Sequence, residues 1–352
     1  MKKKTLVLLG IVALAMMMTA ACSKEKPATG STAGSTTEEA DGASKETEEI
    51  MGWLDDSAKA FADADVYEEK SEGSQNYDDG SATTNRSTTI YDKANGIAET
   101  ISAYENPDDP YRTWYSKEGD TYYEINESKS YDADGVTVTG SSYNRWPVEA
   151  DQIEYVESSV MKKDFSYYQE TEDYAFENFV CEQEGEEEIN GVKAIKVKIT
   201  FDRITKAQEP QAREEFLTDR FTEEEIAAVP GASEALDAYL VELNKFYEKD
   251  STLQMTEEHY FRADNHLLFA SPYTYSEEDE EPEAEETKAL SEASDAFYNL
   301  MYATDANADT PEQTSFTTTT YYYINEECDA MDPIPTNYTD YASMDEYYNQ
   351  FN

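Results

Sequence analysis

The sequence is poor in histidine, cysteine and basic residues. It contains two histidines, three cysteines and 27 lysines and arginines, against 77 aspartates and glutamates, which gives a formal net charge of −50. A nucleic-acid-binding surface needs clustered basic residues to displace counterions from phosphates. The composition therefore excludes a nucleic-acid partner, and it disfavours direct adsorption of the chain to anionic lipid headgroups.

The scarcity of histidine also limits the catalytic chemistry. The only histidines are His259 and His266, on either side of a turn near Ala263. If Phe261 pairs with His266 across this turn, the two imidazoles are separated along the strand pair and do not share a metal. No G-x-S-x-G, H-E-x-x-H or P-loop pattern is present. We therefore assign no catalytic residue, no metal ligand and no cofactor, and a carboxylate-pair glycosidase is the least favoured function.

Two further motifs carry little chemistry. Residues 132–135, Asp-Ala-Asp-Gly, are similar to the start of a calcium loop but lack its later acidic ligands, so we interpret them as a solvated turn. Cys181 and Cys328 either form a disulfide, as exported proteins allow, or stay as two reduced and partly buried thiols, which is the alternative we favour. Without neighbouring histidines they do not make a zinc site.

Long hydrophobic runs are missing except near the N-terminus. Three lysines at positions 2–4 precede an apolar run over about residues 6–18, and small residues then lead to Cys22. This order is typical of an export signal, and the run is shorter than the roughly 20 residues of a membrane-spanning helix. Residues 19–22, Thr-Ala-Ala-Cys, resemble the lipobox of bacterial lipoproteins, although Thr19 replaces the usual leucine.

The resemblance to a lipobox implies that Cys22 carries diacylglycerol and becomes the first residue of the mature chain. Two acyl chains anchor a protein stably, whereas one does so only marginally. We expect a signal peptide at 1–21, a flexible acidic, Ser/Thr/Gly-rich linker at 22–45, a single β-rich domain at 46–330 and an irregular Tyr/Asp-rich tail at 331–352. The chain is expected outside the cytoplasm, held to the bacterial cell membrane.

The body has enough apolar residues for a core, at 39% of the chain, with 12% aromatic. Period-two alternation and Asn-Gly or Gly-Asp turns predict antiparallel strands, and 3.6-residue stripes predict helices. Strands are expected at residues 66–72, 86–92, 97–104, 112–116, 121–126, 165–174, 174–183, 193–201, 254–262, 266–275 and 314–326. Helices are expected at residues 45–64, 222–230, 233–249 and 287–304, the second of them starting with a Thr222–Glu225 capping box. The fold class is α+β, a curved antiparallel sheet covered on one face by helices.

The cleanest alternation predicts which residues face the interior. On the strand at 193–201, the apolar side chains at odd positions share one face, and the helices at 233–249 and 287–304 each have one apolar stripe. The candidate residues lining a cavity between sheet and helices are Ile195, Val197, Ile199, Phe201, Leu236, Leu240, Leu243, Phe297 and Leu300.

Residues 190–197 (Asn-Gly-Val-Lys-Ala-Ile-Lys-Val) and 260–268 (Tyr-Phe-Arg-Ala-Asp-Asn-His-Leu-Leu), separated by a helical insertion, resemble the LolA/LppX-like lipoprotein-carrier family. The resemblance implies a half-barrel with a lid of helices around an apolar cavity. We therefore expect a monomeric, non-enzymatic protein that binds an apolar or lipid-like ligand. The alternative is an acidic cell-surface interaction or adhesion module. Its acidic face, with or without bound Ca²⁺, would bind a cationic partner or the cell wall.

Overall fold

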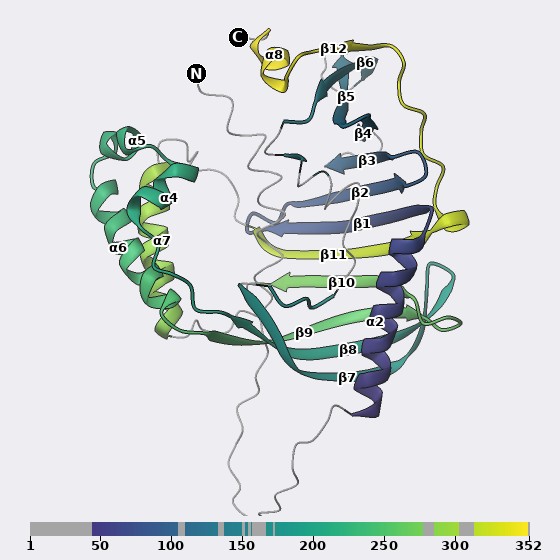
Figure 1. The fold of residues 1–352 in the computed structure, drawn as a ribbon, viewed down its shortest axis with the longest axis horizontal. Coiled ribbons are helices and arrows are strands. Elements are labelled where there is room, and N and C mark those ends of the chain that lie inside the picture. Colours follow the sequence, from purple (N-terminus) through teal and green to yellow (C-terminus); the bar gives the residue numbers. More distant parts are fainter. Residues whose placement is uncertain are drawn as a thin grey trace, which may run out of the picture.

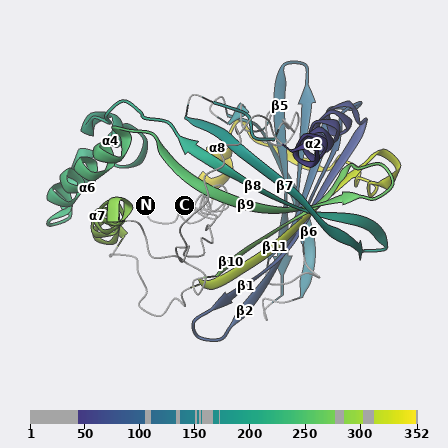
Figure 2. The same cartoon turned by 90° about the horizontal axis from the view of Figure 1, so that it is seen from below.

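A computed structural model describes residues 44–104, 110–132, 137–149, 152–153, 156, 167–171, 173–276, 285–302 and 313–350. Twelve strands form one open sheet in the order β12-β6-β5-β4-β3-β2-β1-β11-β10-β9-β8-β7, in which every neighbouring pair is antiparallel except β12 with β6. The strand direction rotates across the sheet, as the usual strand twist requires (Figures 1 and 2). The leader, Cys22 and nearly all of the expected linker lie outside the described residues.

The strands are β1 Val66–Tyr77, β2 Ala82–Asp92, β3 Ile97–Tyr104, β4 Tyr111–Glu118, β5 Thr121–Tyr131, β6 Val138–Pro147, β7 Tyr174–Ile189, β8 Val192–Thr205, β9 Ser251–Arg262, β10 Leu268–Ser276, β11 Gln313–Ile324 and β12 Tyr338–Asp340. The helices are α2 Lys45–Asp63, α4 Arg213–Arg220, α5 Glu223–Ala228, α6 Ala232–Tyr247, α7 Glu285–Tyr302 and α8 Met344–Asn349, with a short 3₁₀ turn at Asn325–Glu327.

Helix α2 forms where the sequence predicts it and packs on the sheet. Ser44 caps it by accepting a 3.1 Å hydrogen bond from the Thr47 amide. Its buried apolar side chains, which include Leu54 and Phe61, join the core formed with the odd-numbered apolar residues of β8. In Figure 1 the helix crosses the strands from β7 towards β1. A sheet face that is apolar at this end is thereby removed from water.

Two tight turns fix the register of their hairpins. Asn190 and Gly191 have φ angles of 52° and 80°, and Gly96 has a φ of 62°. Asparagine and glycine tolerate this left-handed conformation, which the two-residue turn at Asn190–Gly191 needs. Gly96 is the last residue of a four-residue turn between the paired residues Asp92 and Ile97. The predicted hairpins β2–β3 and β7–β8 are confirmed.

Several predicted elements differ from the structure. Strand β1 runs to Tyr77, beyond the predicted end at residue 72, because polar side chains on both of its faces hide the alternation. The described part of 165–174 before Tyr174 is not a strand, and α4 was not predicted. The tail is not wholly irregular, since it contributes β12 beside β6 and helix α8. Phe261 pairs with Leu268, not with His266. The turn is longer than predicted because His266 belongs to it: this residue has a φ of 60°, and its amide donates a hydrogen bond to the Arg262 carbonyl.

Helices α4 to α7 form a cluster of their own. The Thr222–Glu225 capping box is present at the start of α5, as predicted. Phe297 of α7 is fully buried against α4 and α6. Figure 1 shows these helices beside the ends of the strands rather than across the middle of the sheet. Several helices were expected to cover one face of the sheet. Among them, helix α2 has its buried apolar side chains in the core cluster of the sheet.

The two faces of the sheet are different. The face that carries Val197, Tyr322 and helix α2 is called the α2 face. Residues 328–340, called the strap, follow β11, contact the opposite face near the ends of the strands and end with β12 beside β6. In Figure 1 the strap is the yellow segment that runs along the right-hand ends of the strands.

Two fully buried carboxylates hold the strap. Glu68 accepts a 3.0 Å hydrogen bond from the Asp329 amide, and Glu99 accepts one of 2.7 Å from the Asp332 amide. Lys70 joins Glu68 to the Asp329 side chain, and Arg112 joins Glu99 to that of Asp332. Burial raises the pKa of both glutamates. The strap is thus attached twice by the same arrangement of a buried acid, a base and a backbone amide.

The two cysteines of the body are free thiols. Cys181 is buried and Cys328 is half-buried, and burial raises their pKa to about 11 and about 12. The reduced alternative is therefore confirmed, and both thiols are protonated at neutral pH.

Candidate functional site

The nine candidate cavity residues fall into two separate clusters. Ile195, Val197, Ile199 and Phe201 belong to the core between β8 and α2. Leu236, Leu240, Leu243 and Phe297 are buried between α6 and α7, with Leu300 packed against them. The structure therefore gathers each group but does not bring the two groups together around one space.

The middle of the α2 face is polar. Strand register places short hydroxyl side chains next to one another from β11 to β4, and Asn126 continues the series on β5. The hydroxyl track, as we call it, consists of Ser71, Ser87, Thr89, Thr100, Ser102, Thr113 and Thr320. All seven are half-buried. With strands about 4.8 Å apart, the series from β11 to β5 extends about 24 Å across the sheet.

Two pairs within the hydroxyl track, and Thr113 with Asn126, are within hydrogen-bond distance. Ser71 Oγ lies 2.8 Å from Thr320 Oγ1, Thr89 Oγ1 lies 3.4 Å from Thr100 Oγ1, and Thr113 donates to Asn126 at 2.5 Å. A hydroxyl has one donor and two acceptor sites, so each pair retains hydrogen-bonding capacity for a further partner. The track can therefore bind polar groups laid across the strands.

At the β9 end, the track meets a network of titratable groups around the buried His259. His259 Nδ1 lies 2.9 Å from Ser271 Oγ, and its Nε2 lies 3.2 Å from Glu257 Oε2. Tyr168 donates to the same Glu257 oxygen at 2.6 Å. Burial alone raises the pKa of Glu257, but its bonds to His259 and Tyr168 outweigh that effect and hold the pKa below its usual value. His266, by contrast, stacks on Trp53 of α2.

Charge is distributed unequally over the two faces. Lys70, Arg86 and Arg112 each precede a track residue by one position and therefore point to the strap face. The acidic Glu69 and Glu124 share the α2 face with the track by register. An anionic ligand on the track would meet carboxylates and few bases, so the electrostatics favour a neutral or cationic one.

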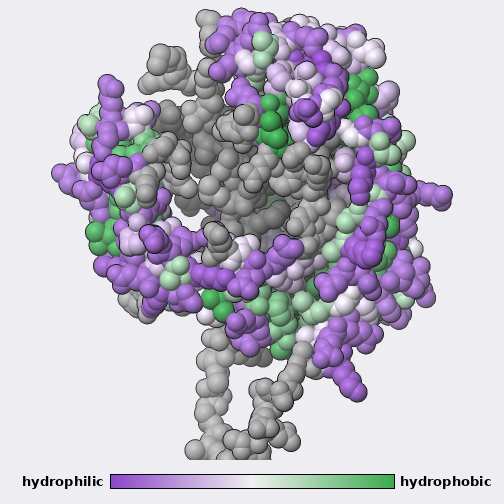
Figure 3. Space-filling model, viewed as in Figure 1, coloured by the Kyte–Doolittle hydropathy of each residue, from purple (hydrophilic) through white to green (hydrophobic). Residues whose placement is uncertain are grey.

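Aromatic side chains lie beside the track. Tyr91 and Tyr115 are half-buried on the α2 face, against Ala98 and Tyr122, and Tyr322 packs with Phe61 of α2. Figure 3 shows a mainly hydrophilic described surface with smaller hydrophobic patches, one of them over the helices at the left. The α2 face thus combines hydroxyls with aromatic rings.

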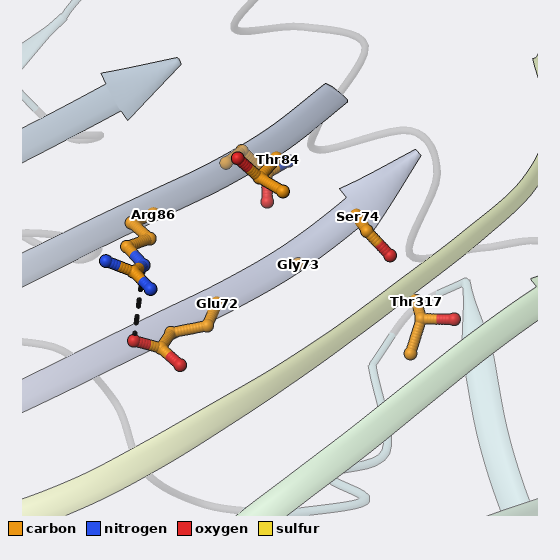
Figure 4. A pocket seen from close by; sticks show the side chains of 7 residues that line it. Glu72, Gly73, Ser74, Thr84, Arg86 and Thr317 are labelled. Atoms are coloured by element: carbon orange, nitrogen blue, oxygen red, sulfur yellow. Dashed lines mark ion pairs between the residues drawn. The ribbon is translucent and has the colours of Figure 1, made fainter. Parts of the chain in front are cut away.

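A cavity of about 310 Å³ lies at the far ends of β1 and β2. Figure 4 shows Glu72 and Arg86 at one side of it, paired at 3.5 Å. Both side chains are more than half exposed. None of the nine candidate residues lines this cavity.

The described part of the chain contains no group of three or more histidine, cysteine, aspartate or glutamate side chains arranged to hold a metal ion. Within the same residues, no helix has the length and hydrophobicity needed to span a membrane. Residues 133–135 of the supposed calcium loop lie outside the described residues, as does Cys22.

Sequence reasoning missed the hydroxyl track. Its signal was present as serines and threonines at alternate positions, for example Ser87 with Thr89 and Thr100 with Ser102. These residues form a continuous surface only when six strands pair. The residue pattern of a single strand does not show which strands pair with it.

Comparisons with known proteins give similarities at low identity. Neither a protein-family model nor a curated protein matches the sequence. Among solved structures, the lipoprotein LppX of Mycobacterium tuberculosis is matched at 11% identity with a TM-score of 0.33, covering 80% of this chain and 98% of LppX. A putative outer membrane lipoprotein-sorting protein domain from Vibrio parahaemolyticus matches at 10% identity and a TM-score of 0.20, covering 80% and 95%. A LolA superfamily protein from Nitrosomonas europaea matches at 7% and 0.19, covering 78% and 91%.

These solved structures include LppX and a LolA superfamily protein, the two proteins after which the resemblance noted in the sequence is named. At such TM-scores the resemblance carries no argument about ligand or function.

Proposed function

We propose that the chain is an extracytoplasmic lipoprotein, anchored through diacylglycerol on Cys22, that binds a lipid-like ligand on the α2 face without changing it chemically. The observation that supports the binding role is the α2 face between β11 and β5, where half-buried hydroxyls and tyrosines share one face of the sheet. Sites for small molecules combine apolar lining with a few placed polar groups. An amphiphile fits this combination better than a purely apolar chain.

The anchor and the ligand are tested separately. For the anchor, bacteria expressing the full chain are labelled with tritiated palmitate and then fractionated. We expect label and membrane attachment that are lost in Cys22→Ala. Label that persists in Cys22→Ala, or a wild-type chain in the cytosol with its leader intact, would contradict the anchor.

For the ligand, the chain purified from a lipid-containing host is analysed by native mass spectrometry. We expect a bound species in the mass range of a lipid, displaceable by a fluorescent fatty acid. A protein that is consistently empty and does not bind the fatty acid would contradict the binding role.

A second candidate function, an ester hydrolase, rests on one observation. Ser271, His259 and Glu257 form a continuous hydroxyl–imidazole–carboxylate chain of hydrogen bonds, the order in which a serine nucleophile is activated. His259 is buried, so the network also suits a purely structural role. Hydrolysis of p-nitrophenyl esters by the wild type that disappears in Ser271→Ala would support the hydrolase. Equal background rates for the wild type and Ser271→Ala would contradict the hydrolase and favour the binding role.

A further inference from the structure

The hydroxyl track is a surface that an acyl chain cannot use. Burying a hydroxyl against hydrocarbon costs free energy unless the hydroxyl keeps a hydrogen-bond partner. Ser71 pairs with Thr320 and Thr89 with Thr100, yet each of these hydroxyls keeps unused donor or acceptor capacity. A ligand that covers the track must therefore supply hydrogen bonds along its length.

The charge around the track narrows the class of ligand. The nearest basic side chains of β1, β2 and β4 point to the strap face, where Lys70 and Arg112 are already paired with buried glutamates. Glu69 lies on the α2 face beside Thr89 by register. Among the described residues of β1 to β3, no basic side chain shares this face by register, so a phosphate or sulfate group at Thr89 would lie near this carboxylate without a basic neighbour.

The nearby carboxylates also do not form an exposed cation site. Glu69 accepts a 3.1 Å hydrogen bond from the Tyr67 hydroxyl, and Glu124 accepts one of 2.5 Å from Asn126. Burial raises the pKa of Glu124, although its hydrogen bond from Asn126 lowers it. The groups that extend continuously along the track are neutral hydroxyls and an amide.

On these grounds we infer that the hydroxyl track binds the neutral, hydroxyl-rich oligosaccharide of a glycolipid, laid across strands β11 to β5. Sugar hydroxyls both donate and accept, as the serine and threonine hydroxyls do, and sugar rings stack on aromatic side chains such as Tyr91 and Tyr115. The inference rests on the proposed function, because it names the polar part of the lipid-like ligand bound at the same face.

The strands offer a matched pair of variants for the test. Thr89 and Thr320 belong to the track, whereas Thr88 and Thr319 are their neighbours on the same strands and point to the strap face. All four are half-buried. Valine has nearly the shape of threonine without its hydroxyl, so Thr89→Val/Thr320→Val and Thr88→Val/Thr319→Val change the same chemistry on opposite faces.

Binding of the full chain with Cys22→Ala, which removes its own lipid anchor, is measured by co-sedimentation with phosphatidylcholine vesicles, with and without digalactosyldiacylglycerol, and with phosphatidylglycerol vesicles. Circular dichroism verifies that each variant is folded. We expect preference for the galactolipid vesicles, reduced about tenfold in Thr89→Val/Thr320→Val, the loss expected for about two net hydrogen bonds, and unchanged in Thr88→Val/Thr319→Val. Competition by soluble galactobiose would support recognition of the sugar by itself, and its absence alongside galactolipid preference would support recognition of the sugar on a lipid.

The outcomes separate the two proposals. Equal binding to phosphatidylcholine and galactolipid vesicles, unaffected by Thr89→Val/Thr320→Val, would overturn the oligosaccharide inference and leave the lipid-binding function intact. Preference for phosphatidylglycerol would also overturn it. A chain that binds no vesicle or fatty acid, once its own lipid anchor is replaced through Cys22→Ala, would overturn the proposed function itself.

Discussion

Replacing Glu99 by alanine should release part of the strap without unfolding the sheet. Glu99 is fully buried and accepts hydrogen bonds from the Asp332 amide at 2.7 Å and from Arg112 at 3.2 Å. Arg112 keeps Asp332 as a partner and is partly exposed, so the main loss is the bond to the amide. A hydrogen bond to a charged group contributes about 1.5–3 kcal/mol, and water at the exposed Asp332 recovers some of this, which leaves about 1–2 kcal/mol.

The assay is hydrogen–deuterium exchange of peptides that cover residues 328–340. A loss of about 1.4 kcal/mol in local opening free energy speeds exchange about tenfold, and we expect this change in the strap alone. Glu72→Ala is the control, because the Glu72–Arg86 pair is more than half exposed and such pairs contribute under about 1 kcal/mol. Equal acceleration in both variants, or none in Glu99→Ala, would refute the role assigned to the buried carboxylate.

Three further outcomes are expected. Gly73→Ala should destabilise the protein by about 1–3 kcal/mol in urea unfolding, because a Cβ would lie 2.6 Å from Asn85 Oδ1 and 2.7 Å from the Thr317 carbonyl; Gly140→Ala, with no atom within 4 Å, should be nearly neutral, and equal losses would contradict the packing account. Leu54→Ala should cost about 2–5 kcal/mol by the same assay, since Leu54 is 1% exposed in the α2 core, and a loss below about 1 kcal/mol would mean that α2 packs loosely. Burial raises the pKa of Glu68 and Glu99 above 4.5. The folded state therefore binds these protons more tightly than the unfolded chain, and stability should fall as pH rises from about 4.5 through the raised pKa values. The difference in unfolding free energy between the wild type and Glu68→Gln/Glu99→Gln should shrink at lower pH, and a difference that does not change with pH would contradict the assignment.

Local patterns predicted the elements whose signals are complete within a few residues. The stripe of α2, the Asn190–Gly191 turn and the alternation on β8 each result from one period or one turn conformation, and the structure contains all three. The prediction ended β1 at residue 72 because residues 73–77, Gly-Ser-Gln-Asn-Tyr, show no apolar face. Their place in the sheet is set by pairing with β2 and β11, which the local sequence does not indicate.

The site required information that local patterns lack. The Glu68–Asp329 bond joins residues 261 positions apart, and nothing in either segment indicates the other. The apolar stripes of α6 and α7 were read correctly as buried, but amphipathicity does not specify a partner, and these stripes pack on each other instead of on β8. The hydroxyl track depends in the same way on the register of six strands.

The central claim is that a lipid-like ligand binds the α2 face, and photo-crosslinking with site-specific mapping tests it most directly. The full chain is irradiated with a photoactivatable galactolipid, and the labelled residues are identified by peptide mass spectrometry. We expect labels at α2-face positions of β1 to β5 and β11, such as Thr89 and Thr320. Labels concentrated at strap-face positions such as Thr88 and Thr319, or no label at all, would contradict the account.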